Sequence, residues 1–187
     1  MKIKAASNII QGNNLEIDLS RCIFIGQGRC GRVYLMPDGR VIKIFKDEES
    51  CIQEYIILES VKGNKHFPQA YECRGNSMIR DYVDGVCLDE YIKRNGLSKN
   101  ISQNLAQLIQ DFKKLGFTRL DMRCSHIFVQ MDESIMVIDP REHYSQRVPY
   151  PKKMLGKLKK LHFANKFMRT IKVLYPSLYG EWRNSGT

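Results

Sequence analysis

The chain has 187 residues, of which 43% are hydrophobic, and it carries a formal net charge of +10. This length suits one domain or two small lobes, and no apolar run approaches the roughly 20 residues that span a membrane. The first residues, MKIKAASNIIQGNN, lack the long apolar core of a signal peptide, so we expect a cytoplasmic protein.

The positive charge is concentrated at one end of the chain, and the cysteines show no motif spacing. Residues 140–187 hold 11 Lys and Arg but only 2 Asp and Glu, so the basicity belongs to the C-terminal quarter and favours an acidic partner for one face. The six cysteines are scattered without a C-x-x-C pair, which argues against a zinc site and against a disulfide framework. We interpret them as reduced thiols that mostly pack.

Short strands are predicted over 15–19 and 22–25, followed by a glycine-rich stretch. The sequence FIGQGRCGRVYLMPDGRVIKIF holds G-x-G-x-x-G, formed by Gly26, Gly28 and Gly31. A dinucleotide-binding turn would continue into a helix. Here an apolar run, Pro37-Asp38-Gly39 and a second β-rich run follow instead, which predicts a hairpin with Lys43 in the second run.

An acidic segment, Asp47 to Ser50, is typical of a helix first turn, and the helix is predicted to continue over 51–61. Its predicted apolar set is Ile52, Tyr55, Ile56, Leu58 and Val61. Glu54 lies within this face and is either a solvated helix carboxylate or a functional group.

Two more strands, 69–74 and 77–83, are predicted around the turn Arg74-Gly75-Asn76. A helix is predicted over 98–116, ending at Gly116, with Leu105, Leu108, Ile109, Phe112 and Leu115 at helical spacing. A polar loop from Thr118, a short strand, a turn at 132–134 and a second strand then lead to Asp139.

These motifs, in this order over about residues 22–140, resemble the protein-kinase superfamily, and in particular small atypical microbial serine/threonine-kinase-like proteins. The resemblance implies an α+β, bilobal protein-kinase-like fold. It places an antiparallel β N-lobe at about 1–83, a hinge at about 80–87, and a reduced helical C-lobe at about 88–187.

The resemblance also implies an ATP site in the N-lobe. Glu54 becomes the expected partner that pins Lys43 for phosphate contact, with Glu59 as the alternative. Backbone groups near Asp81 and Val83 would bond the adenine edge. The remaining expected ATP contacts come from the segment around G-x-G-x-x-G, which we call the glycine hairpin. They are Gly26, Gly28, Gly31 and Val33.

A second set of roles falls on the polar loop and on Asp139. Asp121 would orient the substrate hydroxyl, and Arg123 would neutralise the transferred phosphoryl group. Asp139 would hold Mg²⁺ or Mn²⁺. His126 stands where the family has a metal-binding asparagine, and a neutral imidazole suits Mn²⁺ better than Mg²⁺. It is either a metal ligand or a hydrogen-bonding residue that packs the loop.

Besides His126, three further departures from the family pattern bear on whether the protein is catalytically active. Arg119 lies two residues before Asp121 rather than immediately before it, and no A-P-E-like motif follows. Asp139 is followed by Pro140 and not by Phe-Gly, and proline predicts an extended backbone at Asp139.

The tail 152–175 is predicted to form one or two helices. Its apolar stripe is Leu155, Leu158, Leu161, Met168, Ile171 and Leu174, and its basic residues Lys153, Lys157, Lys160, Arg169 and Lys172 lie largely off that stripe. They form either a solvated face or a surface for an acidic protein, nucleic acid or an anionic membrane.

The sequence therefore predicts an ATP-dependent, serine/threonine-type phosphotransferase acting on a hydroxyl-bearing acceptor. One alternative is a non-catalytic pseudokinase that binds nucleotide or a protein partner. A further alternative is a basic nucleic-acid-binding module on a kinase scaffold.

Overall fold

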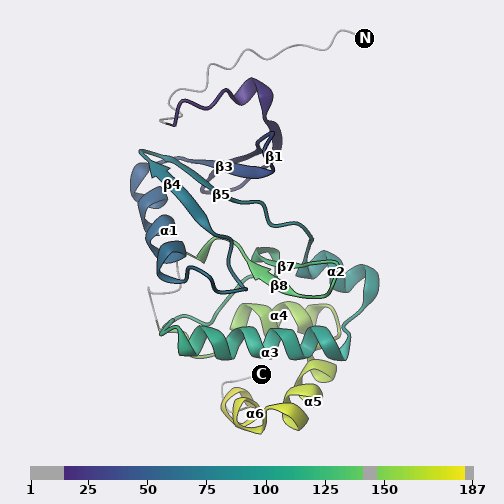
Figure 1. The fold of residues 1–187 in the computed structure, drawn as a ribbon. Helices are drawn as coiled ribbons and strands as arrows, with labels where there is room; N and C mark the ends of the chain where they lie inside the picture. Colours follow the sequence, from purple (N-terminus) through teal and green to yellow (C-terminus); the bar gives the residue numbers. More distant parts are fainter. Residues whose placement is uncertain (1–14, 141–146, 184–187) are drawn as a thin grey trace. The chain divides into compact units, whose positions relative to one another are not determined.

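The computed structural model describes residues 15–140 and 147–183. The fold is α+β, as predicted, with antiparallel sheets and a helical C-terminal part (Figure 1). The chain divides into two compact units, residues 1–56 with 70–82 and residues 57–69 with 83–187.

The first unit is built on a five-stranded antiparallel sheet in the order β1-β2-β3-β5-β4. Its strands are β1 (Ile23–Gln27), β2 (Gly31–Leu35), β3 (Arg40–Phe45), β4 (Ala70–Arg74) and β5 (Ser77–Asp81). Met36 and Arg40 close the β2–β3 turn, where Gly39 has a φ of 84° that favours glycine. The predicted hairpin is confirmed, and because β2 begins at Gly31 the dinucleotide-binding turn is excluded.

The segment before β1 differs from the prediction. The strand expected over 15–19 is wrong: a 3₁₀ turn, η1 (Leu19–Arg21), begins there, and Asp18 caps it by accepting a hydrogen bond from the Ser20 N–H. Apolar residues of this segment instead pack on the face of the sheet formed by Tyr34, Met36, Ile42, Ile44 and Ile79. Its apolar side chains are therefore covered by packing without strand pairing.

Helix α1 (Glu48–Ser60) begins where predicted, with Asp47 accepting a hydrogen bond from the Ser50 N–H at 2.7 Å. Its predicted apolar face is partly wrong, because Ile52 and Ile56 are exposed by 42% and 60%. The residues that the helix buries are Cys51, Glu54, Ile57 and Leu58. A carboxylate thus occupies the inward face.

The second unit contains a three-stranded antiparallel sheet of β6 (Val86–Cys87), β7 (Ile127–Val129) and β8 (Ile135–Val137), together with the 3₁₀ turn η2 (Cys124–His126). Its helices are α2 (Leu88–Asn95), α3 (Lys99–Lys114), α4 (Lys152–Lys160), α5 (Ala164–Leu174) and α6 (Pro176–Arg183). The predicted strand–turn–strand before Asp139 is confirmed by β7 and β8.

Helix α3 confirms the helix predicted over 98–116. Ser98 caps its start by accepting a hydrogen bond from the Ile101 N–H, and Gly116, with a φ of 74°, follows its last residues. Leu105, Leu108, Ile109 and Phe112 of this helix are fully buried. Phe112 stacks on Phe67 at 5.3 Å and meets Phe117 edge-on at 4.8 Å.

The tail predicted over 152–175 forms two helices, α4 and α5, while α6 was not predicted. Leu155, Leu158 and Ile171 of the expected stripe are buried. Burial of Met154, Phe167 and Trp182 was not predicted, and Phe167 stacks on Trp182 at 6.1 Å. Among the helices of the described residues, none combines the length and apolarity needed to cross a membrane.

Candidate functional site

Lys43 and Glu54 form a buried ion pair within the first unit. The Lys43 ammonium lies 2.8 and 2.7 Å from the two carboxylate oxygens of Glu54, and these residues are 3% and 0% exposed. The Phe45 ring lies 4.5 Å from the same ammonium. The predicted pairing of Lys43 with Glu54 is confirmed. The carboxylate of the alternative partner, Glu59, instead lies 3.9 Å from the Lys62 ammonium. Because desolvation offsets most of the attraction in such a pair, stability alone does not account for it.

The three motif glycines differ in what the fold requires of them. A Cβ built at Gly31 would lie 2.1 Å from the carbonyl oxygen of Ile44, so the β2–β3 contact demands glycine. At Gly26 and Gly28 a Cβ would meet nothing within 4 Å, and neither residue has a positive φ. Neither packing nor backbone conformation therefore requires glycine at 26 and 28.

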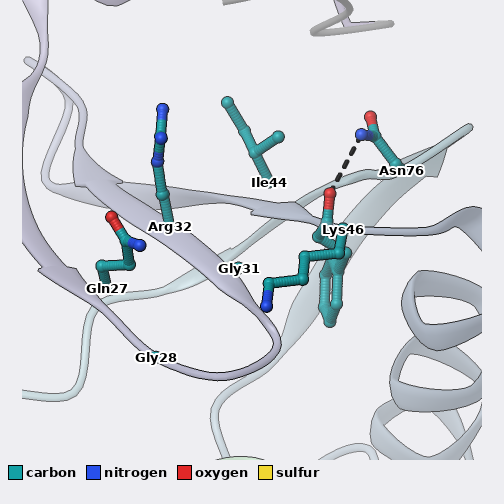
Figure 2. A pocket seen from close by; sticks show the side chains of 8 residues that line it. Gln27, Gly28, Gly31, Arg32, Ile44, Lys46 and Asn76 are labelled. Atoms are coloured by element: carbon teal, nitrogen blue, oxygen red, sulfur yellow. Dashed lines mark hydrogen bonds between the residues drawn. The ribbon is translucent and has the colours of Figure 1, made fainter.

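A pocket of about 280 Å³ lies beside the glycine hairpin. Figure 2 shows the Lys46 side chain extending toward the bend between β1 and β2, while Asn76 donates a hydrogen bond to the carbonyl of Phe45. The pocket is lined by Gln27, Gly28, Gly31, Arg32, Ile44, Phe45, Lys46 and Asn76. The positive charges of Arg32 and Lys46, together with the backbone N–H groups of the glycines, favour binding of an anion in this pocket.

This pocket takes in only part of the predicted ATP site. Gly28 and Gly31 line it, whereas Gly26, Val33 and Lys43 do not. Arg32 pairs with Ile44 across the strands, one residue along from the Val33–Lys43 pair, so these side chains point to the opposite face of the sheet from Lys43.

The residues predicted to contact adenine lie at and after the end of β5. The carboxylate of Asp81 accepts a hydrogen bond from the Tyr71 hydroxyl at 2.6 Å. The backbone carbonyl of Asp81 accepts a hydrogen bond from the buried Arg80 guanidinium at 2.8 Å. Val83 is 5% exposed. An adenine contact at these residues stays a prediction.

Asp121 lies in the second unit against the start of α4. Its carboxylate accepts a hydrogen bond from the backbone N–H of Lys153, and it lies 3.3 Å from the Lys153 ammonium and 3.8 Å from the Arg119 guanidinium. The backbone N–H of Leu120 donates to the carbonyl of Val148 at 2.8 Å, which holds the two segments together.

The role of Lys153 was missed by the sequence reasoning. The helix N-cap is Pro151, whose side chain cannot accept a hydrogen bond. The absence of a local cap could have indicated that a carboxylate from elsewhere in the chain accepts a hydrogen bond from a backbone N–H at the start of α4. Asp121 does so, and it is 8% exposed.

His126 and Asp139 are connected through the backbone. The carbonyl of His126 accepts a hydrogen bond from the Ile138 N–H at 2.9 Å, one residue before Asp139. The extended backbone predicted for Asp139 is wrong, because its φ is 56°. A non-glycine residue there costs about 1–3 kcal/mol and persists only where the surrounding structure imposes it, often at functional sites.

The metal site stays a prediction. Across residues 15–140 and 147–183, no cluster of three or more His, Cys, Asp or Glu could hold a metal ion. Mg²⁺ in nucleotide sites is commonly bound by one or two carboxylates plus phosphates, so a site with few protein ligands fits that chemistry. Arg123, the predicted phosphoryl contact, is exposed.

Two cations of the basic tail are used inside the second unit. Besides Lys153, the Lys157 ammonium lies 3.0 Å from the Asp89 carboxylate. Burial by itself would raise the pKa of Asp89, but hydrogen bonds from Lys157 and from the Cys87 thiol outweigh it and lower that pKa. Lys160, Arg169 and Lys172 are exposed. Binding of nucleic acid or an anionic surface by this tail stays a prediction.

Comparison with known proteins shows a distant similarity, and no protein-family profile matches the chain. The chain is 22% identical over 121 residues to the Bacillus subtilis (strain 168) protein named "Putative serine/threonine-protein kinase YrzF". The aligned part is 62% of this chain and 56% of that protein, so the chain spans just over half the length of this relative.

Proposed function

We propose that this chain is a kinase-like phosphotransferase of the serine/threonine type that moves the γ-phosphoryl group of ATP to a hydroxyl. The observation that carries the proposal is the buried ion pair between Lys43 and Glu54, in which Lys43 lies on β3, after the glycine-rich hairpin, and Glu54 lies on α1. The name of the Bacillus subtilis relative supports the same class.

In this proposal the first unit binds the nucleotide. A glycine within a strand, as Gly26 is in β1, costs about 0.5–1 kcal/mol relative to alanine. Because the fold does not require glycine at 26 or 28, a ligand that approaches the backbone closely would explain both. Lys43, held by Glu54, would supply a fixed positive charge to the phosphates.

In this proposal the second unit supplies the side chains that act on the acceptor hydroxyl, the phosphoryl group and the metal ion. Asp121 would orient the substrate hydroxyl, and the exposed Arg123 would neutralise phosphoryl charge. Asp139 and His126 are the proposed ligands of Mg²⁺ or Mn²⁺. When bound, ATP supplies the phosphoryl group and the metal ion stabilises its negative charge.

One observation favours the second candidate, a non-catalytic pseudokinase. Asp121 is engaged by both the backbone and the side chain of Lys153 and is almost fully buried. A carboxylate committed to a helix start is less available to a hydroxyl. In that case the chain would bind nucleotide or a protein partner without transfer.

Calorimetry tests the nucleotide site first. Wild type should bind ATP, and Lys43→Met should lose that binding. The control is Lys62→Met, because Lys62 is exposed and its ion pair with Glu59 lies at the surface. Unchanged ATP affinity in Lys43→Met would contradict the site.

Phosphoryl transfer with radiolabelled ATP, in Mg²⁺ and in Mn²⁺ separately, then distinguishes the two candidates. The phosphotransferase should label itself or an acceptor, and Asp121→Asn should remove labelling while sparing ATP binding. Tight ATP binding by wild type without transfer under either metal would establish the pseudokinase.

A further inference from the structure

Two cysteine thiols from different elements meet in the first unit. The Sγ atom of Cys51, in α1, lies 3.2 Å from the Sγ atom of Cys73, in β4, although the two residues are 22 positions apart. Both are free thiols; Cys51 is fully buried and Cys73 is half-buried. Only the fold brings them together, since no short-range cysteine motif exists in the sequence.

We propose that Cys51 and Cys73 form a reversible disulfide that clamps helix α1 to strand β4. An S–S bond is about 2.05 Å long, so the two sulfur atoms need to approach by only about 1.2 Å. Side-chain rotation and small backbone shifts can supply such a movement. The pair is therefore a redox modification site within the sheet–helix layer that holds Glu54.

The chemistry needs a two-electron oxidant, and a peroxide is the class we assign. Burial raises the pKa of the Cys51 thiol well above its ordinary value, and the neighbouring Cys73 adds to this, so Cys51 stays protonated. Attack on the oxidant therefore begins at the more accessible Cys73.

The thiolate of Cys73 attacks one peroxide oxygen; an S–O bond forms, the O–O bond breaks, and the leaving hydroxide takes a proton to become water. The sulfur of Cys51 then attacks the sulfur of Cys73. An S–S bond forms, the S–O bond breaks, and the departing hydroxide takes the Cys51 proton as a second water. In total, two thiols are oxidised to a disulfide and one peroxide is reduced to two waters. An added dithiol reduces the disulfide again by thiol–disulfide exchange.

The position of the pair gives the bond a consequence. Cys51 precedes Glu54 by three residues, just under one helical turn, on the same buried face of α1. In this structure the thiols are already adjacent while the Lys43–Glu54 pair is formed. A disulfide would therefore hold α1 where Glu54 reaches Lys43, and would not pull it away.

The test uses the full chain and hydrogen peroxide, followed by alkylation of the remaining thiols, digestion and mass spectrometry. The expected result is one linked peptide joining Cys51 to Cys73, with a loss of two free thiols that dithiothreitol reverses. Cys73→Ser should remove the link. Cys22→Ser, a half-buried cysteine of the same unit, should keep it.

Hydrogen exchange tests the clamp separately. In oxidised wild type the amides of residues 51–60 should exchange about tenfold more slowly than in reduced protein, and peroxide-treated Cys73→Ser should show no slowing. Absence of the linked peptide, linkage of other cysteines in equal yield, or sulfinic and sulfonic acids alone would overturn the disulfide. Formation of the bond with unchanged exchange would overturn the clamp. Wild type alone gives both readouts, so the test stands even where a variant fails to fold.

Discussion

The carboxylate of Asp121 accepts a hydrogen bond from the backbone N–H of Lys153, the second residue of α4. One side chain thus stabilises a helix start and also stands at the position proposed to orient a hydroxyl. Negative charge at a helix N-terminus is favourable, so this contact has a structural role that does not depend on any catalytic role of Asp121. For substitutions at Asp121, the free energy of unfolding must therefore be measured as well as the activity.

We predict that Asp121→Ala lowers the free energy of unfolding by about 1–2 kcal/mol, because the start of α4 loses its only side-chain cap among the described contacts. Asp121→Asn keeps an oxygen that can accept the same hydrogen bond and should cost less than half as much. Urea denaturation followed by circular dichroism measures both. Equal losses in the two variants would contradict the capping role.

Breaking the buried ion pair should be costly, whereas replacing both partners should not. Either Lys43→Met or Glu54→Leu alone leaves one buried charge without its partner, and we expect each to lower the free energy of unfolding by about 3–5 kcal/mol. The double variant should recover most of that loss, because two apolar side chains fill the same buried space. Its ATP binding, measured by calorimetry, should stay absent. Recovery of binding in the double variant would show that Lys43 does not contact the nucleotide.

The glycine hairpin allows a matched comparison of structure and function. Gly31→Ala should destabilise the first unit by more than about 2 kcal/mol, because its Cβ would press on the backbone carbonyl of Ile44. Gly28→Ala should leave the melting temperature unchanged within about 2 °C, since its Cβ meets nothing. If the proposal is right, Gly28→Ala weakens ATP binding nevertheless. Unaltered ATP affinity in that variant would remove the argument for the glycine hairpin.

Acid should weaken the second unit through Asp111. Burial by itself would raise the pKa of Asp111, but hydrogen bonds from Gln107 and from His66, at 3.1 Å, outweigh it and lower that pKa. Because the folded pKa lies below the unfolded value of about 3.9, the contribution is fully present above about pH 4–5 and is lost as the pH falls through the folded pKa.

The measurement for Asp111 is the urea unfolding free energy between pH 2.5 and pH 6, compared with Asp111→Asn. The wild-type advantage over the variant should shrink steadily as the pH falls below about 4. The other described carboxylates with lowered pKa values are present in both proteins and cancel in the difference; they are Asp18, Asp38, Asp89, Asp132 and Glu133. A constant difference across this range would refute the assignment to Asp111.

Local signals in the sequence determined the elements whose chemistry is short-range. The turn at Pro37–Gly39 places β2 beside β3, because turn residues select their backbone angles without distant help. Apolar periodicity, a serine cap and Gly116 define α3. The Lys43–Glu54 pair was predicted through the resemblance to the protein-kinase superfamily, which the order of a glycine hairpin, a strand lysine and a helix glutamate carries.

Only the tertiary structure decided where long-range contacts compete with local preference. Periodicity placed Ile52 and Ile56 inward, but in the structure the buried face of α1 carries Glu54, paired with Lys43, and Cys51, beside Cys73, and both isoleucines are exposed. Proline predicted an extended Asp139, whereas the chain holds it at a positive φ. The meeting of Asp121 with Lys153, and of Cys51 with Cys73, joins residues 32 and 22 positions apart. No local pattern encodes such pairs, because their partners are chosen by the packing of whole elements.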